Sequence, residues 1–461
     1  MFHTLFSLDA ASPLPLYEQI YRSFVSAIQS GELKCGEKLP SKRALCAQLG
    51  VSQSTVETAY GILISEGYIV SRPKSGYYAA EYDAAPAWRS AETREKAPEY
   101  AHISPPEIDF STAAVDTRLF PYSSWAKLNK EVVYSSPELL QRGDGQGEPA
   151  LRYALSAFLS QYRGVVCTPG QIVIGAGIEV LMGLLLPLFG PDAEFALEDP
   201  GYSAIDELLR GSGRKIHHIP VDSGGMSPEG LTGSAASIAY ITPSHQFPLG
   251  ASMSAGRRSR FLRWASEAEG RYIIEDDYDS EFRYASRPIP AMQGMDSSGR
   301  VIYIGTFSRS LAPSIRMAYM VLPDALMERY KSVFSHRQST VSRYEQAVMA
   351  RFLEEGFYSR YIRRVGSLYK RRRARLIDSF SSADALSISG DSGGMHFLIT
   401  HRTLSEQELI SRAAEKGITL RGLSAYCREL PPIPSTLVLG YGGLRDDKIE
   451  EAVSILLDAW K

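Results

Sequence analysis

The chain has 461 residues, of which 44% are hydrophobic, and a formal net charge of −2. This length predicts two or three domains, and the near-neutral charge excludes a global basic field, so any nucleic-acid contact must be local. The four cysteines form no CxxC pair, no apolar stretch is long enough for a bilayer, and the start lacks a basic signal-peptide region. These features predict a cytoplasmic protein with reduced thiols and no membrane contact.

Composition divides the chain into three regions. Residues 1–80 contain short helical periods followed by a hairpin-like segment, and residues 81–106 are rich in Ala, Pro and charge, as linkers are. Residues 107–461 alternate apolar strands with amphipathic helices, which predicts an α/β domain with a mainly parallel sheet. The strands expected there are Gln171–Ile174, Glu194–Glu198, Lys215–Ile219, Ile238–Ile241, Tyr272–Glu275 and Val301–Ile304.

The first region has the spacing of a helix-turn-helix. Residues 15–30 place apolar side chains on one helical face, from Leu16 to Ile28. Ser41 can cap a helix that ends at Gly50, and Ser52 can cap the next one. Two short helices joined by a tight turn are typical of DNA-binding modules, although a plain helical bundle with coincidental caps has the same spacing.

The expected DNA contacts lie at three places. The second of the two helices would present its N-terminal residues to base edges, and the hairpin after it would be a wing that carries basic side chains toward phosphates. Residues at the start of the first of the two helices would add further polar and basic groups. The predicted contact residues are Ser41, Lys42, Arg43, Ser52, Gln53, Ser54, Thr55, Arg72, Lys74 and Gly76.

Residue identity makes the helix-turn-helix more specific. The segments PLYEQI, GEKLPSKRALCAQLGVS, TVETAYGILISEGYI and SGYY closely resemble the winged helix-turn-helix of the GntR family. The resemblance implies an N-terminal winged helix-turn-helix DNA-binding domain. Because one near-neutral copy would bind weakly, we expect a dimer on an operator with repeated half-sites. Gln53 stands where the family often has an arginine, so base preference should differ.

The large region contains an expected anion site. Gly175-Ala176-Gly177 follows a strand and opens a helix, where backbone N–H groups can hold an anion, although such a short glycine pattern is common without one. Thr306 and Arg316, after the last expected strand, would add a hydroxyl and a guanidinium.

Other polar and aromatic residues also follow strand ends. Asp276 belongs to an acidic run (residues 275–279) that ends a strand, and an aspartate there can pair with a protonated ring nitrogen, with Tyr278 just beyond it. The alternative is a solvated or metal-binding acidic loop. Tyr202, after DPG, can stack on a ring, and His245 can meet a ring or a substrate, although both residue types are often only structural.

The order of these motifs is specific. GAG, DPGY, TPSHQFPLG, EDDYDSEF and TFSRSLAPSIR strongly resemble the fold type I, class I aminotransferase domain, a domain that uses pyridoxal 5'-phosphate. With the winged helix-turn-helix at its N-terminus (the head), the whole chain resembles the MocR/GabR family of transcriptional regulators, which are usually head-to-tail homodimers. The resemblance implies that Tyr202 stacks on the coenzyme ring, Asp276 meets its nitrogen, Tyr278 its phenolic oxygen and Arg316 its phosphate. His245 takes the asparagine-like position near the ring.

Two departures from the aminotransferase pattern bear on function. The lysine that forms the Schiff base is replaced by Arg309, whose guanidinium stays protonated and has no free amine. The position of the arginine that binds the substrate carboxylate is Val438, for which Arg421 or Arg428 could substitute. We therefore expect a catalytically inactive regulator that senses a small-molecule effector and binds pyridoxal phosphate, or an adduct of it, non-covalently. A coenzyme-free ligand-binding or dimerisation scaffold and an active aminotransferase are the alternatives.

Overall fold

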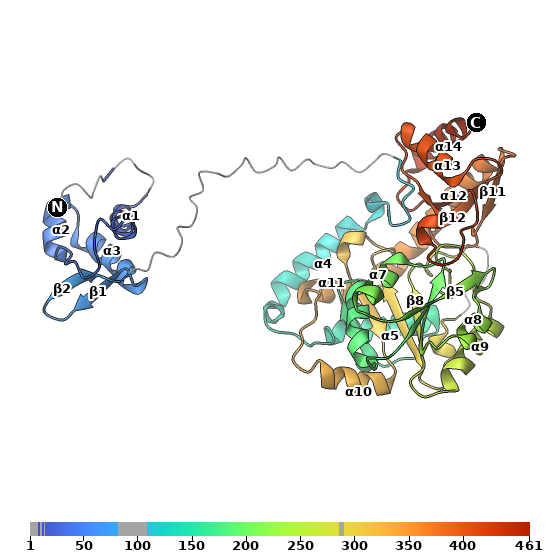
Figure 1. The fold of residues 1–461 in the computed structure, drawn as a ribbon, viewed down its shortest axis with the longest axis horizontal. Helices are drawn as coiled ribbons and strands as arrows, with labels where there is room; N and C mark the ends of the chain where they lie inside the picture. Colours follow the sequence, from blue (N-terminus) through green and yellow to red (C-terminus); the bar gives the residue numbers. More distant parts are fainter. Residues whose placement is uncertain (1–7, 10–11, 13, 82–107, 285–289) are drawn as a thin grey trace. The chain divides into compact units, whose positions relative to one another are not determined.

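The computed structural model describes residues 8–9, 12, 14–81, 108–284 and 290–461 (Figure 1). The chain separates into two compact units, Met1–Ile103 and Ser104–Lys461. Except for Glu81, the linker predicted at residues 81–106 lies outside the described residues. In the described part of the chain, no helix combines the length and the apolar character needed to cross a membrane. The four cysteines are all described, and all are free thiols.

Where it is described, the first unit contains three helices and a two-stranded antiparallel hairpin, as predicted. Its helices have the bounds α1 Leu16–Gln29, α2 Lys42–Leu49 and α3 Gln53–Ser65, and its strands are β1 Ile69–Arg72 and β2 Gly76–Ala79. The Ser41 hydroxyl accepts the Ala44 amide, and the Ser52 hydroxyl accepts the Thr55 amide, so both predicted caps are formed.

One expected core position of the first unit is exposed. Ile20, Phe24 and Ile28 are buried on one face of α1, but Leu16 is 37% exposed. Leu16 is the first residue of the helix, one turn before the buried stretch begins. The helical period therefore identifies the buried face correctly but extends it one turn too far.

The second unit is built on an eight-stranded sheet of order β3-β10-β9-β8-β7-β4-β5-β6. The five central strands β9, β8, β7, β4 and β5 are parallel, whereas β10 is antiparallel to both its neighbours and β6 is antiparallel to β5. All six predicted strands are present. The bounds are β3 Ile172–Gly175, β4 Phe195–Asp199, β5 Ile216–Asp222, β6 Gly225–Met226, β7 Ile238–Ile241, β8 Tyr272–Asp277, β9 Val301–Thr306 and β10 Ala318–Val321.

Helices pack around this sheet, and a smaller antiparallel sheet lies at one end of the unit (Figure 1). The helices are α4 Tyr122–Ser135, α5 Pro149–Arg163, α6 Ile178–Leu185, α7 Ser203–Gly211, α8 Pro228–Gly233, α9 Ala255–Ser266, α10 Asp324–Val333, α11 Arg343–Glu354, α12 Phe357–Ser381, α13 Glu406–Glu415 and α14 Ile449–Ala459. The small sheet has the order β11-β12-β14-β13, with bounds β11 Leu386–Ser389, β12 His396–His401, β14 Thr436–Gly440 and β13 Arg421–Gly422.

Candidate functional site

The motifs predicted to bind a coenzyme follow different strands but meet at one edge of the large sheet. Because β3, β4, β7, β8 and β9 run in the same direction, their carboxyl ends share this edge, where open α/β sheets bind ligands. A cavity of about 420 Å³ lies there. Seven of the ten residues predicted for the coenzyme line it: Gly177, Tyr202, Asp276, Tyr278, Thr306, Arg309 and Arg316.

Asp276 offers an unpaired carboxylate oxygen to this cavity. Its Oδ2 accepts a hydrogen bond of 2.5 Å from the Tyr240 hydroxyl. Its Oδ1 is buried and has no partner among the described residues. Burial raises the pKa of Asp276 to about 7, and the charges of Asp277 and Asp279 add to this effect. A cationic N–H donor in the cavity would satisfy the free oxygen and favour its charge.

The other acids of the run are buried as well. Asp277 pairs with Arg163 over 2.6 Å, and this ion pair holds its pKa at about 2 against the effect of burial. Glu275 accepts the backbone amides of residues 292 and 293. The alternative of a solvated acidic loop is therefore wrong, since no acid in the run is more than 4% exposed. Only Asp279 belongs to a group with metal-ligand character, formed with His245 and His396.

Several hydrogen-bond donors line the cavity near the start of α6 and the segment after β9. Gly177 has a φ of 99°, which favours glycine, and a Cβ at this position would displace the Arg316 guanidinium. Arg316 pairs with Glu179 over 2.9 Å, and both side chains line the cavity. The Ser308 hydroxyl is buried without a partner among the described residues and lines the same space, next to Thr306. This set of donors suits an anion.

Ser308 was missed by the sequence analysis because a single serine gives no pattern, and only burial marks it. Gly175 and Ala176 were predicted to bind the phosphate but are not among the residues that line the cavity. The Ala176 amide donates to the Thr340 hydroxyl over 2.9 Å, and a Cβ on Gly175 would press on Leu181. These two residues shape the turn before α6.

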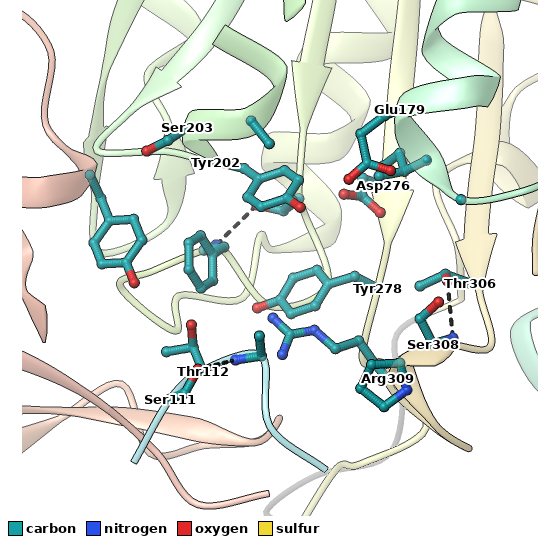
Figure 2. A pocket seen from close by; sticks show the side chains of 18 of the residues that line it. Ser111, Thr112, Glu179, Tyr202, Ser203, Asp276, Tyr278, Thr306, Ser308 and Arg309 are labelled. Atoms are coloured by element: carbon teal, nitrogen blue, oxygen red, sulfur yellow. Dashed lines mark hydrogen bonds between the residues drawn. The ribbon is translucent and has the colours of Figure 1, made fainter. Parts of the chain in front are cut away.

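Aromatic side chains also line the cavity. Tyr202 lines the cavity, and its ring meets that of Phe247 edge to face at 6.0 Å. Figure 2 shows the Tyr202 ring above Tyr278. His245, predicted to face the ring, is not among the lining residues; its Nδ1 lies 3.0 Å from the Tyr278 hydroxyl. Phe247, two residues further along the same loop, lines the cavity in its place.

Arg309 enters the cavity from the segment after β9. Its guanidinium carbon lies 5.8 Å from the centre of the Tyr278 ring, and Figure 2 shows the guanidinium beside that ring. Nη1 is buried and has no partner among the described residues. No lysine is among the residues that line the cavity in the described part of the chain. A charged donor therefore occupies the centre of the site, without a nucleophilic amine beside it.

The two arginines considered as substitutes at Val438 have different surroundings. Val438 is buried in β14, and Arg421 is its direct register partner on β13. Arg421 lines the cavity. Arg428 instead contacts Asp206 at 3.3 Å and does not line it. Of the two, only Arg421 can meet a ligand in this cavity.

The predicted DNA contacts lie on the first unit as a separate surface. Gln53 and Ser54 are exposed at the start of α3, and Arg43 is exposed at the start of α2. In the hairpin, Arg72 lies over the Tyr78 ring at 4.6 Å, and Lys74, with a φ of 59°, is exposed at the turn. The remaining predicted contacts, Ser41, Lys42, Ser52, Thr55 and Gly76, border these residues.

Comparison with known proteins identifies both units. Residues 16–78 match the model of bacterial regulatory proteins of the gntR family, and residues 106–456 match that of aminotransferase class I and II. The chain is 38% identical to an HTH-type transcriptional regulator, YdeL, of Bacillus subtilis over 98% of both chains. It is 34% identical to the probable rhizopine catabolism regulatory protein MocR of Rhizobium meliloti, over 98% of this chain and 95% of the relative.

Two further similarities were found, one to a regulator over nearly the whole chain and one to a solved enzyme structure. The chain is 29% identical to the pyridoxine biosynthesis transcriptional regulator PdxR of Corynebacterium glutamicum, over 97% of this chain and 95% of the relative. Among solved structures, kynurenine aminotransferase of Pyrococcus horikoshii superposes with a TM-score of 0.67 at 24% identity, covering 77% of this chain and 91% of the enzyme. That likeness shows the fold of the large unit.

Proposed function

Since this chain belongs to the MocR-type regulators of the GntR family, with a helix-turn-helix head and an aminotransferase class I and II domain, we propose that its large unit binds pyridoxal 5'-phosphate non-covalently and acts as a sensor for the head. The observation that carries the proposal is a cavity in which Asp276 Oδ1, Ser308 Oγ and Arg309 Nη1 have no partner and no lysine lines the wall, as far as the described residues extend. The groups suit a ring nitrogen and an anion, whereas covalent attachment needs an amine.

Each described group has a defined part in this proposal. Asp276 would hold the ring nitrogen protonated, and Ser308 with Arg316 would hold the phosphate beside the start of α6. Tyr202 would cover the ring face. When bound, pyridoxal phosphate supplies an electron-withdrawing ring and an aldehyde that reacts with amines. Arg309 cannot carry a proton to and from a substrate carbon as a lysine does, so we propose that the domain is catalytically inactive.

Calorimetric titration of the full chain with pyridoxal phosphate tests this proposal. We expect saturable binding that dialysis reverses, with no coenzyme fixed to the protein by borohydride and no transamination above background. Pyridoxal without the phosphate should bind at least about tenfold more weakly, because it leaves Arg316 and Ser308 unused. Absence of saturable binding would favour the coenzyme-free scaffold, and a borohydride-fixed product on the wild-type chain would contradict the non-covalent mode.

Coenzyme affinity should depend on pH through Asp276. Burial raises the pKa of the Asp276 carboxyl to about 7, so this carboxyl is protonated in the empty site below that pH. To pair with a protonated ring nitrogen, the carboxyl must lose its proton, so binding releases one proton there. We expect affinity to fall as pH drops through 7, by up to about tenfold per pH unit well below it. Titrations between pH 5.5 and 8 measure this. Asp276→Asn should bind more weakly and retain only the pH dependence of the phosphate itself.

We propose a homodimer, head-to-tail as in the related regulators. Large apolar side chains are exposed on α4 and on the short helix η3 (Pro137–Leu140) that follows it: Tyr122 is 62% exposed, Val133 54%, Tyr134 80% and Leu140 79%. Such clustering of exposed apolar side chains is typical of interfaces. A dimer would also give two heads for repeated half-sites.

Charging this surface should produce monomers. We expect Tyr134→Glu combined with Leu140→Glu to shift sedimentation from dimer to monomer, because association would then bury two carboxylates per chain. The matched control is Val333→Glu combined with Ile433→Glu, two exposed apolar residues outside α4 and η3. A dimer that persists in the first variant would place the interface elsewhere.

A further inference from the structure

A chain of three polar side chains leads from the cavity into the protein interior. The Tyr278 hydroxyl lies 3.0 Å from His245 Nδ1, which in turn lies 3.0 Å from Asp279 Oδ2. Tyr278 lines the cavity, whereas the His245 and Asp279 side chains are only 4% and 3% exposed. One imidazole nitrogen thus faces both a phenol and a carboxylate.

The position of one proton decides what the phenol can do. With a proton on Nδ1, His245 donates to the carboxylate, and the Tyr278 hydroxyl has no acceptor on the imidazole. With Nδ1 unprotonated, its lone pair would face the carboxylate lone pairs of Asp279 at 3.0 Å, which is repulsive. His245 Nε2 is buried and has no hydrogen-bond partner among the described residues. In the first arrangement Nε2 carries only a lone pair, whereas in the second it would carry an unpaired N–H, which costs more free energy, so the first arrangement is favoured.

The protein backbone closes over this pair. Gly394, just before β12, has a φ of 69°, and a Cβ there would overlap both His245 and Asp279. Its carbonyl accepts a hydrogen bond of 2.7 Å from the Tyr441 hydroxyl, which fixes the peptide in place. The backbone therefore packs directly on the imidazole–carboxylate contact, beside a second, smaller cavity of about 100 Å³ that both side chains line.

We propose that Asp279 and His245 are positioning residues that hold the Tyr278 hydroxyl as a hydrogen-bond donor toward the cavity. There it forms, with the Arg309 guanidinium beside its ring, a two-donor site for an anionic oxygen of the ligand (Figure 2). This inference rests on the proposed function, in which the ligand ring carries an ionised hydroxyl. The inference explains how Arg309 can contribute to ligand recognition. The Tyr278 hydroxyl and the Arg309 guanidinium both donate to the same ligand oxygen, and neither group has to gain or lose a proton.

The first test compares pyridoxal phosphate with its 3-deoxy analogue, which lacks the ring hydroxyl, on the full chain. We expect the wild type to prefer the coenzyme by about tenfold or more. Asp279→Asn should reduce this preference to about twofold or less, because a neutral amide, unlike a carboxylate, does not oppose a lone pair on Nδ1, and that lone pair can then accept the Tyr278 hydroxyl. Binding of the 3-deoxy analogue should stay unchanged, which separates repositioning from a damaged fold.

Two further variants frame this result. Tyr278→Phe should also abolish the preference, whereas Asp458→Asn, which removes an exposed carboxylate on α14, should retain it in full. A preference that survives in Asp279→Asn overturns the inference while leaving coenzyme binding intact. If the wild type binds neither compound, the proposed function is wrong. The inference about His245 and Asp279 can then still be tested by a second experiment that needs no ligand.

The second test needs no ligand. Nitrogen-15 spectra of the histidine rings in the ligand-free chain report which nitrogen carries the proton, with His245 assigned by the missing signal in His245→Gln. We expect Nδ1 of His245 to be protonated. An unprotonated Nδ1 overturns the inference whatever the coenzyme does.

Discussion

Arg309→Lys is expected to convert a dialysable coenzyme into one that is covalently held. A lysine amine at this position would enter the cavity beside the Tyr278 ring, between the proposed ring and phosphate contacts. Nearby guanidinium groups and burial both disfavour a protonated amine, so a fraction would be free to attack the aldehyde. We expect about one coenzyme per chain to survive dialysis after borohydride treatment, with a new visible absorbance before it, whereas the wild type retains almost none.

The matched control places the same amine elsewhere in the same cavity. Arg421→Lys adds a lysine on β13, opposite Val438, at a lining position that is not next to Tyr278 in sequence or in register. We expect this variant to fix no coenzyme. Equal trapping in both variants would mean that any lysine in the cavity reacts. No trapping in Arg309→Lys would mean that the ring and phosphate groups do not hold the coenzyme as proposed.

The sequence predicted the frame of this site because its signals are local. Apolar runs bounded by turn residues mark strands, and all six expected strands formed within one or two residues of their predicted start. The antiparallel strand β10 was not among the expected strands. Each of the seven lining residues that the sequence predicted belongs to a segment at the end of a strand, where a parallel sheet gathers residues from distant parts of the chain.

The parts that the sequence did not predict depend on contacts across the chain. The Ala176 amide is occupied by Thr340, a partner 164 residues away. Phe247 lines the cavity where His245 was expected, and the His245 imidazole packs against Gly394, which lies just before β12 and far away in the sequence. Ser308 is marked only by burial without a partner. No spacing rule contains this information.

The second large effect is expected in DNA binding. Arg43 and Lys74 are exposed on the two elements proposed to meet the sugar–phosphate backbone, at the start of α2 and at the turn of the hairpin. Replacing both with alanine in a dimer removes four proposed phosphate contacts. We expect operator affinity to fall by about 100-fold or more near physiological salt, and the slope of log affinity against log salt to decrease by about 4. Gel shifts at several salt concentrations measure both.

The control and a second variant separate phosphate binding from base reading. Arg22→Ala with Lys34→Ala removes the same charge from exposed positions in and just after α1, and should leave affinity within about threefold. Gln53 lies at the start of α3 and donates to Glu57 over 3.1 Å, so it can reach a base edge only after leaving that carboxylate. We therefore expect Gln53→Ala to relax preference at one base pair of each half-site without changing the salt slope. Unchanged affinity in the Arg43 and Lys74 variant would show that the docking surface lies elsewhere on the head.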